Sequence, residues 1–300
     1  FMEAVSKMAQ IPSDVPATMG QPGAFTSFFG PDPLNLLGVV ILTSLGTWGL
    51  PQMIGKFYAI KDEKSINTGT VISTLFAIVI SGGCYFLGGF GRLFDSAEIY
   101  NAETGAVVYD SIIPSMLSKL PDILIGIVVV LVLSASMSTL SSLVLTSSST
   151  MTLDLLKDNI MKEMSEKKQI ITMQILIVFF IVVSVVIALD PPTFIAQLMG
   201  ISWGALAGAF LAPFLYGLYW KGVTRAGVWA GFIAGVGITV SNMFIGYIAS
   251  PINAGAAAMV AGLVIVPLVS LVTPKLKKED VDEIFTCYEE KVVSTKKRNL

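Results

Sequence analysis

Seven long runs of apolar residues constrain the fold of this chain more than any other feature of its sequence. Each run can cross a hydrocarbon core of roughly 30 Å as a helix of about 20 residues. None of them alternates with a period of two, and lipid offers no partners to unpaired backbone groups, so spanning helices are expected rather than strands. The runs cover residues 34–54, 68–90, 123–152, 170–189, 194–220, 226–248 and 254–272. The sequence therefore predicts an all-α integral membrane protein.

The composition excludes several classes of function. Only 13% of the residues are charged, about half the fraction that is usual in soluble domains. The net charge of −2 gives no basic excess for a nucleic-acid partner. The chain has no His, and its two Cys, Cys84 and Cys287, form no ligand motif, so zinc sites, iron–sulfur sites and His-dependent nucleophilic catalysis are not expected. We therefore expect no enzyme activity.

The basic residues predict the orientation in the membrane. If the N-terminus lies outside, 16 of the 19 Lys and Arg residues fall in the inward loops and in the tail over 275–300. Cytoplasmic loops of membrane proteins carry such an excess. We therefore predict an N-terminus outside and a cytoplasmic tail, with a short amphipathic helix near residues 281–288.

The outward segments are longer and contain turn signals. Residues 1–33 hold five prolines and are predicted to be an external loop, and residues 95–122 form a second one, with a turn at 101–105 and a short helix over 111–120. This second loop can act as a lid or simply connect two helix ends. The chain opens Phe1-Met2 with no signal-peptide pattern, so we expect a fragment or a trimmed chain.

The third run carries a dense stripe of hydroxyl residues. At helical spacing Ala135, Ser138, Thr139 and Ser142 share one face, and Ser141 borders it. No Asp or Glu lies in the middle of any of the seven runs, so a cation bound here would need neutral oxygens: hydroxyls and a carbonyl freed near Ala135. The other interpretation is close helix packing, for which small hydroxyl residues are common and which this pattern alone favours.

The first run is interrupted by two glycines and a proline. Gly46, Gly49 and Pro51 stand beside Thr47 and Trp48. Transporters place their substrates near broken helices of this kind, whereas the simpler interpretation is a proline kink with an interfacial Trp. In the fifth run, Gly200, Gly204 and Gly208 predict a face for close packing.

Three segments together resemble the sodium:solute symporter family. Residues 49–60 are similar to its loop signature, Gly-x-Pro-x followed by a basic residue, an apolar pair and Ala. Residues 135–142, followed by Ser147, Ser148 and Asp154, are similar to its sodium-site helix. Residues 202–227 look closest to the sodium/proline branch, and the resemblance covers most of residues 34–275.

The resemblance implies a LeuT-like inverted-repeat transporter. The five helices within 34–220 would form the second repeat, 221–274 would hold two peripheral helices, and the first repeat would lie outside this chain. The main sodium site maps onto Ala135, Ser138 and Thr139, and a second sodium site onto Ser141 and Ser142. The substrate-facing positions map onto Thr43, Thr47 and Trp48. Thr43 and Gln52 depart from the proline carriers, which have an aromatic residue and His there, so the resemblance does not fix proline as the substrate.

The expected function is thus sodium-coupled import of a small organic solute, such as an amino acid or an organic acid, by alternating access. Its partners would be Na⁺, the solute and the lipid of a plasma membrane, expected to be a bacterial cytoplasmic membrane, and the protein would be a monomer or a weak oligomer. Two alternatives remain open. A seven-helix membrane receptor fits the span count, but Cys84 has no external partner for the usual disulfide. A passive channel would need a selectivity ring, which the sequence does not show.

Overall fold

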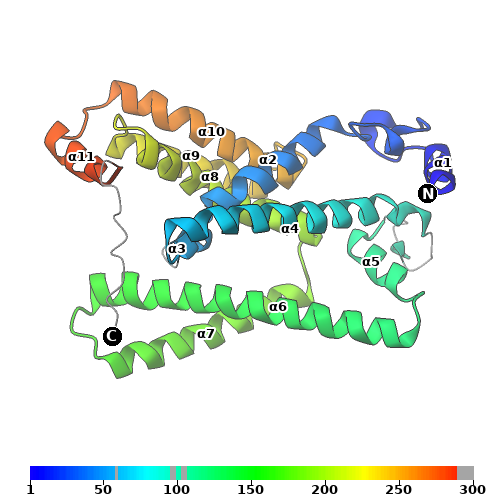
Figure 1. The fold of residues 1–300 in the computed structure, drawn as a ribbon, viewed down its shortest axis with the longest axis horizontal. Helices are drawn as coiled ribbons and strands as arrows, with labels where there is room; N and C mark the ends of the chain where they lie inside the picture. Colours follow the sequence, from blue (N-terminus) through cyan, green and yellow to red (C-terminus); the bar gives the residue numbers. More distant parts are fainter. Residues whose placement is uncertain (58–59, 95–98, 103–106, 289–300) are drawn as a thin grey trace. The chain divides into compact units, whose positions relative to one another are not determined.

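A computed structural model describes residues 1–57, 60–94, 99–102 and 107–288 (Figure 1). Every named element within these ranges is a helix, and one isolated bridge pairs Tyr100 with Val107. The chain divides into two compact units, Phe1–Pro31 with Ala59–Ile195 and Asp32–Tyr58 with Ala196–Leu300. Each unit is described by itself.

The first unit contains three of the long helices. Two of them, α6 and α7, run side by side (Figure 1). Its helices are α1 (Met2–Gln10), α4 (Glu63–Gly89), α5 (Tyr109–Leu117), α6 (Asp122–Thr150), a π-helix (Met151–Ile160) and α7 (Glu166–Leu189). Three short 3₁₀ turns lie at Pro16–Thr18, Ala24–Thr26 and Gly91–Leu93.

The apolar side chains of this unit are largely uncovered. Neither α4 nor α7 buries a single described residue. An exposed apolar surface of this extent is expected to face lipid or further protein.

The helix α4 begins earlier than the apolar run predicts. The Asp62 carboxylate accepts hydrogen bonds from the backbone N–H and the hydroxyl of Ser65, both at 2.7 Å, and so caps the helix before the first apolar residue. These bonds hold the pKa of the Asp62 carboxyl below its usual range. The helix therefore begins five residues before the apolar run, because a polar cap extends it beyond its apolar part.

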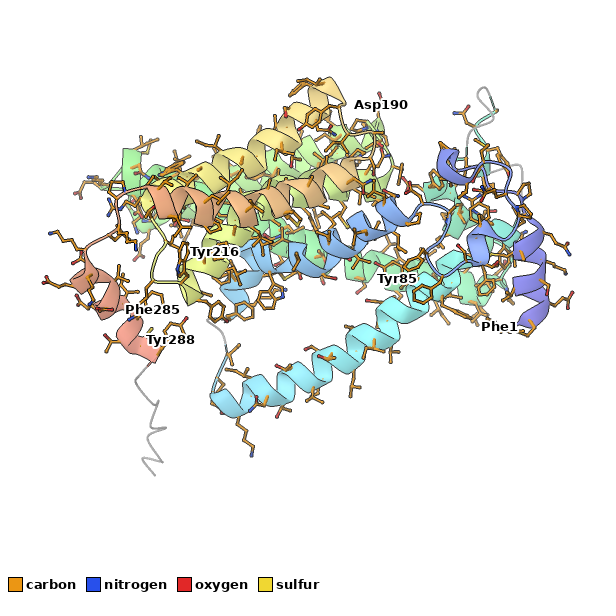
Figure 2. All side chains as sticks on the ribbon, turned by 90° about the horizontal axis from the view of Figure 1, so that it is seen from above. Phe1, Tyr85, Asp190, Tyr216, Phe285 and Tyr288 are labelled. Atoms are coloured by element: carbon orange, nitrogen blue, oxygen red, sulfur yellow. The ribbon has the colours of Figure 1, made fainter. Side chains whose placement is uncertain are left out.

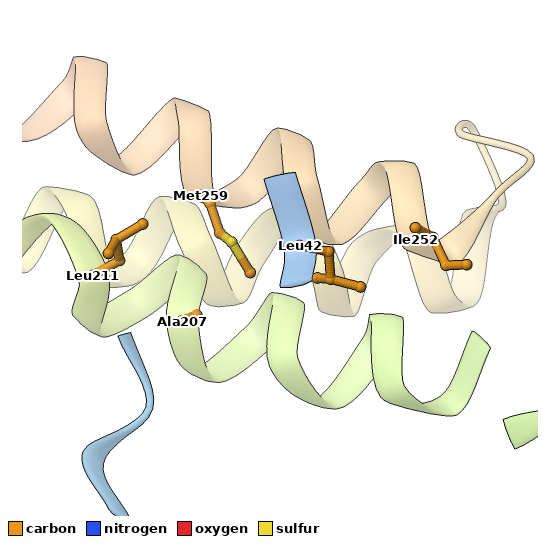
Figure 3. Close-up of a cluster of buried hydrophobic side chains, with 5 residues drawn as sticks. All are labelled: Leu42, Ala207, Leu211, Ile252 and Met259. Carbon is orange, nitrogen blue, oxygen red and sulfur yellow. The ribbon is translucent and has the colours of Figure 1, made fainter. Parts of the chain in front are cut away.

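The second unit is a packed bundle in which α10 lies against α2 and α9 (Figure 1). Its helices are α2 (Pro33–Gly49), α3 (Pro51–Phe57), α8 (Ile195–Tyr219), α9 (Arg225–Ile245), α10 (Pro251–Val272) and α11 (Lys278–Phe285). A buried cluster joins three of them, formed by Leu42, Ala207, Leu211, Ile252 and Met259 (Figure 3).

Small residues let the backbones of this unit approach closely. A Cβ added at Gly204 would lie 2.5 Å from the Cα of Gly255, so only glycine fits there. Gly200 and Gly208 are buried on the same helix. The prediction that this glycine face serves close packing is confirmed.

The tail helix α11 is fixed to the turn that follows α8. Lys221 Nζ lies 2.7 Å from Asp282 Oδ1, and the Tyr288 hydroxyl donates to the Leu218 carbonyl at 3.0 Å. Figure 2 labels Phe285 and Tyr288 at this end of the chain. The short helix predicted near residues 281–288 is present.

The number of spans agrees with the sequence prediction. Six described helices are long and apolar enough to cross a membrane, and α2 with α3, bent by 53°, can make a seventh. The third span is longer than its apolar run, because the π-helix carries it to Ile160 through polar residues. The short helix predicted over 111–120 is α5, whereas part of the turn predicted at 101–105 lies outside the described residues.

Candidate functional site

The predicted sodium-site residues lie on one face of α6. The helix runs unbroken from Asp122 to Thr150, so Ala135, Ser138, Thr139 and Ser142 keep the helical spacing that brings them together. All four residues are exposed within the described chain. The expected release of a carbonyl near Ala135 is not observed, because the helix has no break at that position.

The hydroxyls of this helix fall into two groups. Ser141 donates to the Met137 carbonyl at 2.7 Å, and Thr146 donates to the Ser142 carbonyl at 2.8 Å, so both bond to their own helix. By contrast, the hydroxyls of Ser138, Thr139 and Ser142 make no hydrogen bond to any described residue. These three oxygens are therefore available to a ligand.

The hydroxyl face points away from the only buried part of α6 among the described residues. Val144 and Ser148 are the buried residues of this helix. Val144 lies about 180° around the helix from Ala135. Close packing within the first unit therefore does not account for the hydroxyl stripe.

The predicted break in the first span is present at Leu50. There α2 ends at Gly49, α3 begins at Pro51, and the two axes differ by 53°. A Cβ at Gly49 would lie 2.8 Å from the Cα of Ala207, so the absence of a side chain allows the end of α2 to contact α8. The break is held in place by direct backbone packing.

The three predicted substrate residues precede this break and do not share one face. Thr43 and Thr47 are four residues apart and lie on one flank of α2. Trp48 lies about 100° further around the helix from Thr47. The Thr43 hydroxyl donates to the Val39 carbonyl at 2.8 Å and that of Thr47 to the Ser44 carbonyl at 3.3 Å, whereas Trp48 is 57% exposed.

The donor set fits a hard monovalent cation better than a transition metal. Among the described residues no group of three or more His, Cys, Asp or Glu side chains could bind a metal ion. The described chain offers hydroxyl oxygens on α6 in the first unit, and backbone oxygens beside the break at the end of α2 in the second.

Two side chains that the sequence pattern did not single out are distinctive in the structure. The hydroxyl of Thr152, in the π-helix, is buried and has no hydrogen-bond partner among the described residues. Tyr216 on α8 donates to a carbonyl of α10. The only sequence signal for the Tyr216 hydrogen bond is Pro267, which leaves a carbonyl of α10 without its helical donor. The sequence does not show which side chain donates to that carbonyl instead.

Comparisons with known proteins identify relatives that align with most of this chain. The model of the sodium:solute symporter family matches residues 1–235. A sodium/pantothenate symporter of Haemophilus influenzae is 30% identical over 236 residues, which are 78% of this chain and 46% of that protein. A sodium/proline symporter of Staphylococcus aureus is 28% identical over 258 residues, which are 82% of this chain and 49% of that protein.

The chain thus spans about half the length of the curated relatives it matches. No solved structure matches it. The family match includes both the broken span and the hydroxyl-bearing helix α6. The chain belongs to the sodium:solute symporter family.

Proposed function

We propose that this chain is part of a sodium-coupled symporter that imports a small organic solute by alternating access. The observation that carries the proposal is the family match over residues 1–235, together with relatives named as sodium-coupled symporters. The geometry supports the proposal too, because the hydroxyls of Ser138, Thr139 and Ser142 lie on one exposed face of α6 and make no hydrogen bond to a described residue.

The main sodium site would be formed by Ala135, Ser138 and Thr139. Na⁺ is a hard cation that prefers oxygen ligands, and the hydroxyls of Ser138 and Thr139 are adjacent on the helix and unpaired within the described chain. Ser142 and Ser141 would belong to a second sodium site. Because no carboxylate lies within the apolar part of the spans, negative charge for these sites would come from outside this chain.

The solute would bind beside the break between α2 and α3. Thr43 and Thr47 lie on one flank of α2 just before the break, and Trp48 is exposed beside it. Broken helices in transporters present unpaired backbone groups to substrates. The relatives are named for pantothenate and for proline, so a carboxylate-bearing solute is the first class to test.

The architecture would be the LeuT-like inverted repeat. In this assignment α2 with α3, then α4, α6, α7 and α8 form the second repeat, and α9 and α10 are peripheral. The N-terminus would lie outside and the tail inside a bacterial cytoplasmic membrane, as the basic residues predict. Sodium would favour the outward-open state and order the solute site before the bundles rock.

The test is a solute screen on the complete gene product that contains this chain, reconstituted in vesicles. An inward sodium gradient should drive accumulation of at least one solute from a panel that includes proline, pantothenate, other amino acids and organic acids. Replacing sodium with choline should abolish that accumulation. Uptake of every solute at the same rate with and without a sodium gradient would contradict the proposal.

A further inference from the structure

The helix α10 contains an internal proline that leaves one backbone carbonyl without its helical partner. Pro267 lies within Pro251–Val272 and has no N–H. The carbonyl four residues earlier, that of Leu263, therefore lacks the hydrogen bond that residue 267 would otherwise donate. Leu263 packs against the buried cluster of this unit, in the apolar part of the span, where water cannot replace the lost donor.

A side chain from another helix provides the missing donor. The Tyr216 hydroxyl, on α8, donates to the Leu263 carbonyl at 2.8 Å. Figure 2 labels Tyr216. Its ring meets the ring of Trp220 edge to face at 5.9 Å, which fixes the direction of the phenol.

This contact differs from most of the hydroxyl contacts of the spans. Ser184 and Thr239, for example, donate to carbonyls four residues earlier in their own helices. Such bonds do not connect one helix to another. The Tyr216 bond joins α8 to α10.

The bond also lies close to the internal proline of each helix. Pro213 lies inside α8, three residues before Tyr216, and the acceptor lies four residues before Pro267 in α10. A helix can bend at an internal proline. A cross-link at this level therefore controls whether the ends of α8 and α10 bend together or separately.

We propose that Tyr216 is a positioning residue that ties the C-terminal half of α8 to α10, so that the two move as one body. Breaking the bond in lipid would leave the Leu263 carbonyl unpaired, which disfavours any state in which the helices separate. The statement that α8 and α10 move as one body during transport rests on the proposed function. The statement that the Tyr216 bond ties the two helices together does not depend on it.

The test is a mutant cycle on the complete gene product. Tyr216→Phe removes the hydroxyl and keeps the ring, whereas Pro267→Ala gives the Leu263 carbonyl a helical N–H. The matched control is Tyr247→Phe. The Tyr247 hydroxyl donates to the Ile238 carbonyl at 2.8 Å, and residue 242, four positions on, is an Asn that retains its N–H.

The first measurement is the apparent unfolding temperature in detergent, which needs no transport. Tyr216→Phe should lower it by about 2 °C or more. The same substitution should lower it by less than half as much when residue 267 is Ala, and Tyr247→Phe should leave it within error. An equal shift with and without Pro267, or no shift at all, would overturn the assignment of the bond.

The second measurement is the distance between spin labels at Tyr219 and Val272, which are 70% and 83% exposed near the ends of α8 and α10. Cys84, Cys287 and any further cysteine of the complete gene product are first replaced by Ser. We expect one narrow distribution that stays unchanged when sodium and solute are added, and a broader one in Tyr216→Phe that narrows again with Pro267→Ala. A distribution that shifts with ligand in the unmutated pair would show that the helices move separately and would refute the inference, even where sodium-driven uptake is intact.

Discussion

At the scale of single residues, the candidate site depends on which hydroxyls are already bonded. The spacing of Ala135, Ser138 and Thr139 predicts their common face, and α6 has that face. The sequence cannot tell that Ser141 donates to its own helix while Ser138 does not, because that choice depends on side-chain rotamers. Nor can it identify Tyr216 as the partner of Leu263, since the two residues are 47 positions apart and on different helices.

The ion pair of the tail makes a prediction at this scale. The hydrogen bond from Lys221 lowers the pKa of Asp282 below its ordinary value of 3.8. Because the pKa of Asp282 is lowered only in the docked state, its ion pair stabilises docking fully at pH values above 3.8. This stabilisation is lost as the pH falls through the lowered pKa. Docking of α11 should therefore be constant between about pH 5 and 8 and should weaken only in stronger acid.

A spin label on the native Cys287, with Cys84 and any further cysteine of the protein replaced by Ser, reports this docking. Asp282→Asn should increase the mobility of the label at pH 7, whereas Asp280→Asn should leave it unchanged, because Asp280 makes no ion pair with a described residue. Equal mobility in Asp282→Asn and the unmutated tail would show that the pair does not hold α11.

At the scale of helices, the apolar runs predict the spans well, because lipid leaves no other use for such segments. Their ends are less predictable. The cap at Asp62 and the π-helix after Thr150 both extend helices through polar residues, where hydropathy gives no signal. The break at Leu50 could be predicted because Gly49 and Pro51 flank it, but its 53° bend could not.

Helix packing makes a second prediction, for two glycines of α9. A Cβ at Gly235 would meet the backbone of Gly208 and lie 2.6 Å from the nitrogen of Ala209, whereas a Cβ at Gly237 would meet nothing within 4 Å. Gly235→Ala should therefore destabilise the bundle by about 1–3 kcal/mol. Gly237→Ala should be neutral or stabilising by up to about 1 kcal/mol, through helix propensity. Apparent unfolding temperatures in detergent compare the two variants, and a Gly235→Ala protein as stable as Gly237→Ala would contradict the packing seen here.

At the scale of the whole molecule, the bias of basic residues makes a third prediction. If the tail is cytoplasmic, Cys287 lies inside the cell and is exposed there. In a variant that keeps Cys287 as its single cysteine, a membrane-impermeant maleimide should label Cys287 only after the cells are permeabilised. Labelling of Cys287 in intact cells would place the tail outside and so contradict the proposed orientation.

The sequence predicts each unit of the molecule better than it predicts a complete site. The chain spans about half of its relatives' length, and the hydroxyls of α6 lie on a face that the first unit does not cover. The ligands and the charge that would complete a sodium site therefore cannot be derived from these residues.

The most direct test of the central claim is the sodium dependence of uptake after Ser138→Ala with Thr139→Ala. This variant removes two hydroxyls that would be sodium ligands under the proposal, and a loss of about 1.4 kcal/mol corresponds to a factor of ten in affinity. The sodium concentration for half-maximal uptake should therefore rise about tenfold or more, whereas Ser184→Ala, whose hydroxyl donates to the Phe180 carbonyl at 2.8 Å, should leave it unchanged. An unchanged sodium dependence in the double variant, with uptake intact, would show that α6 does not bind the coupling ion through these hydroxyls.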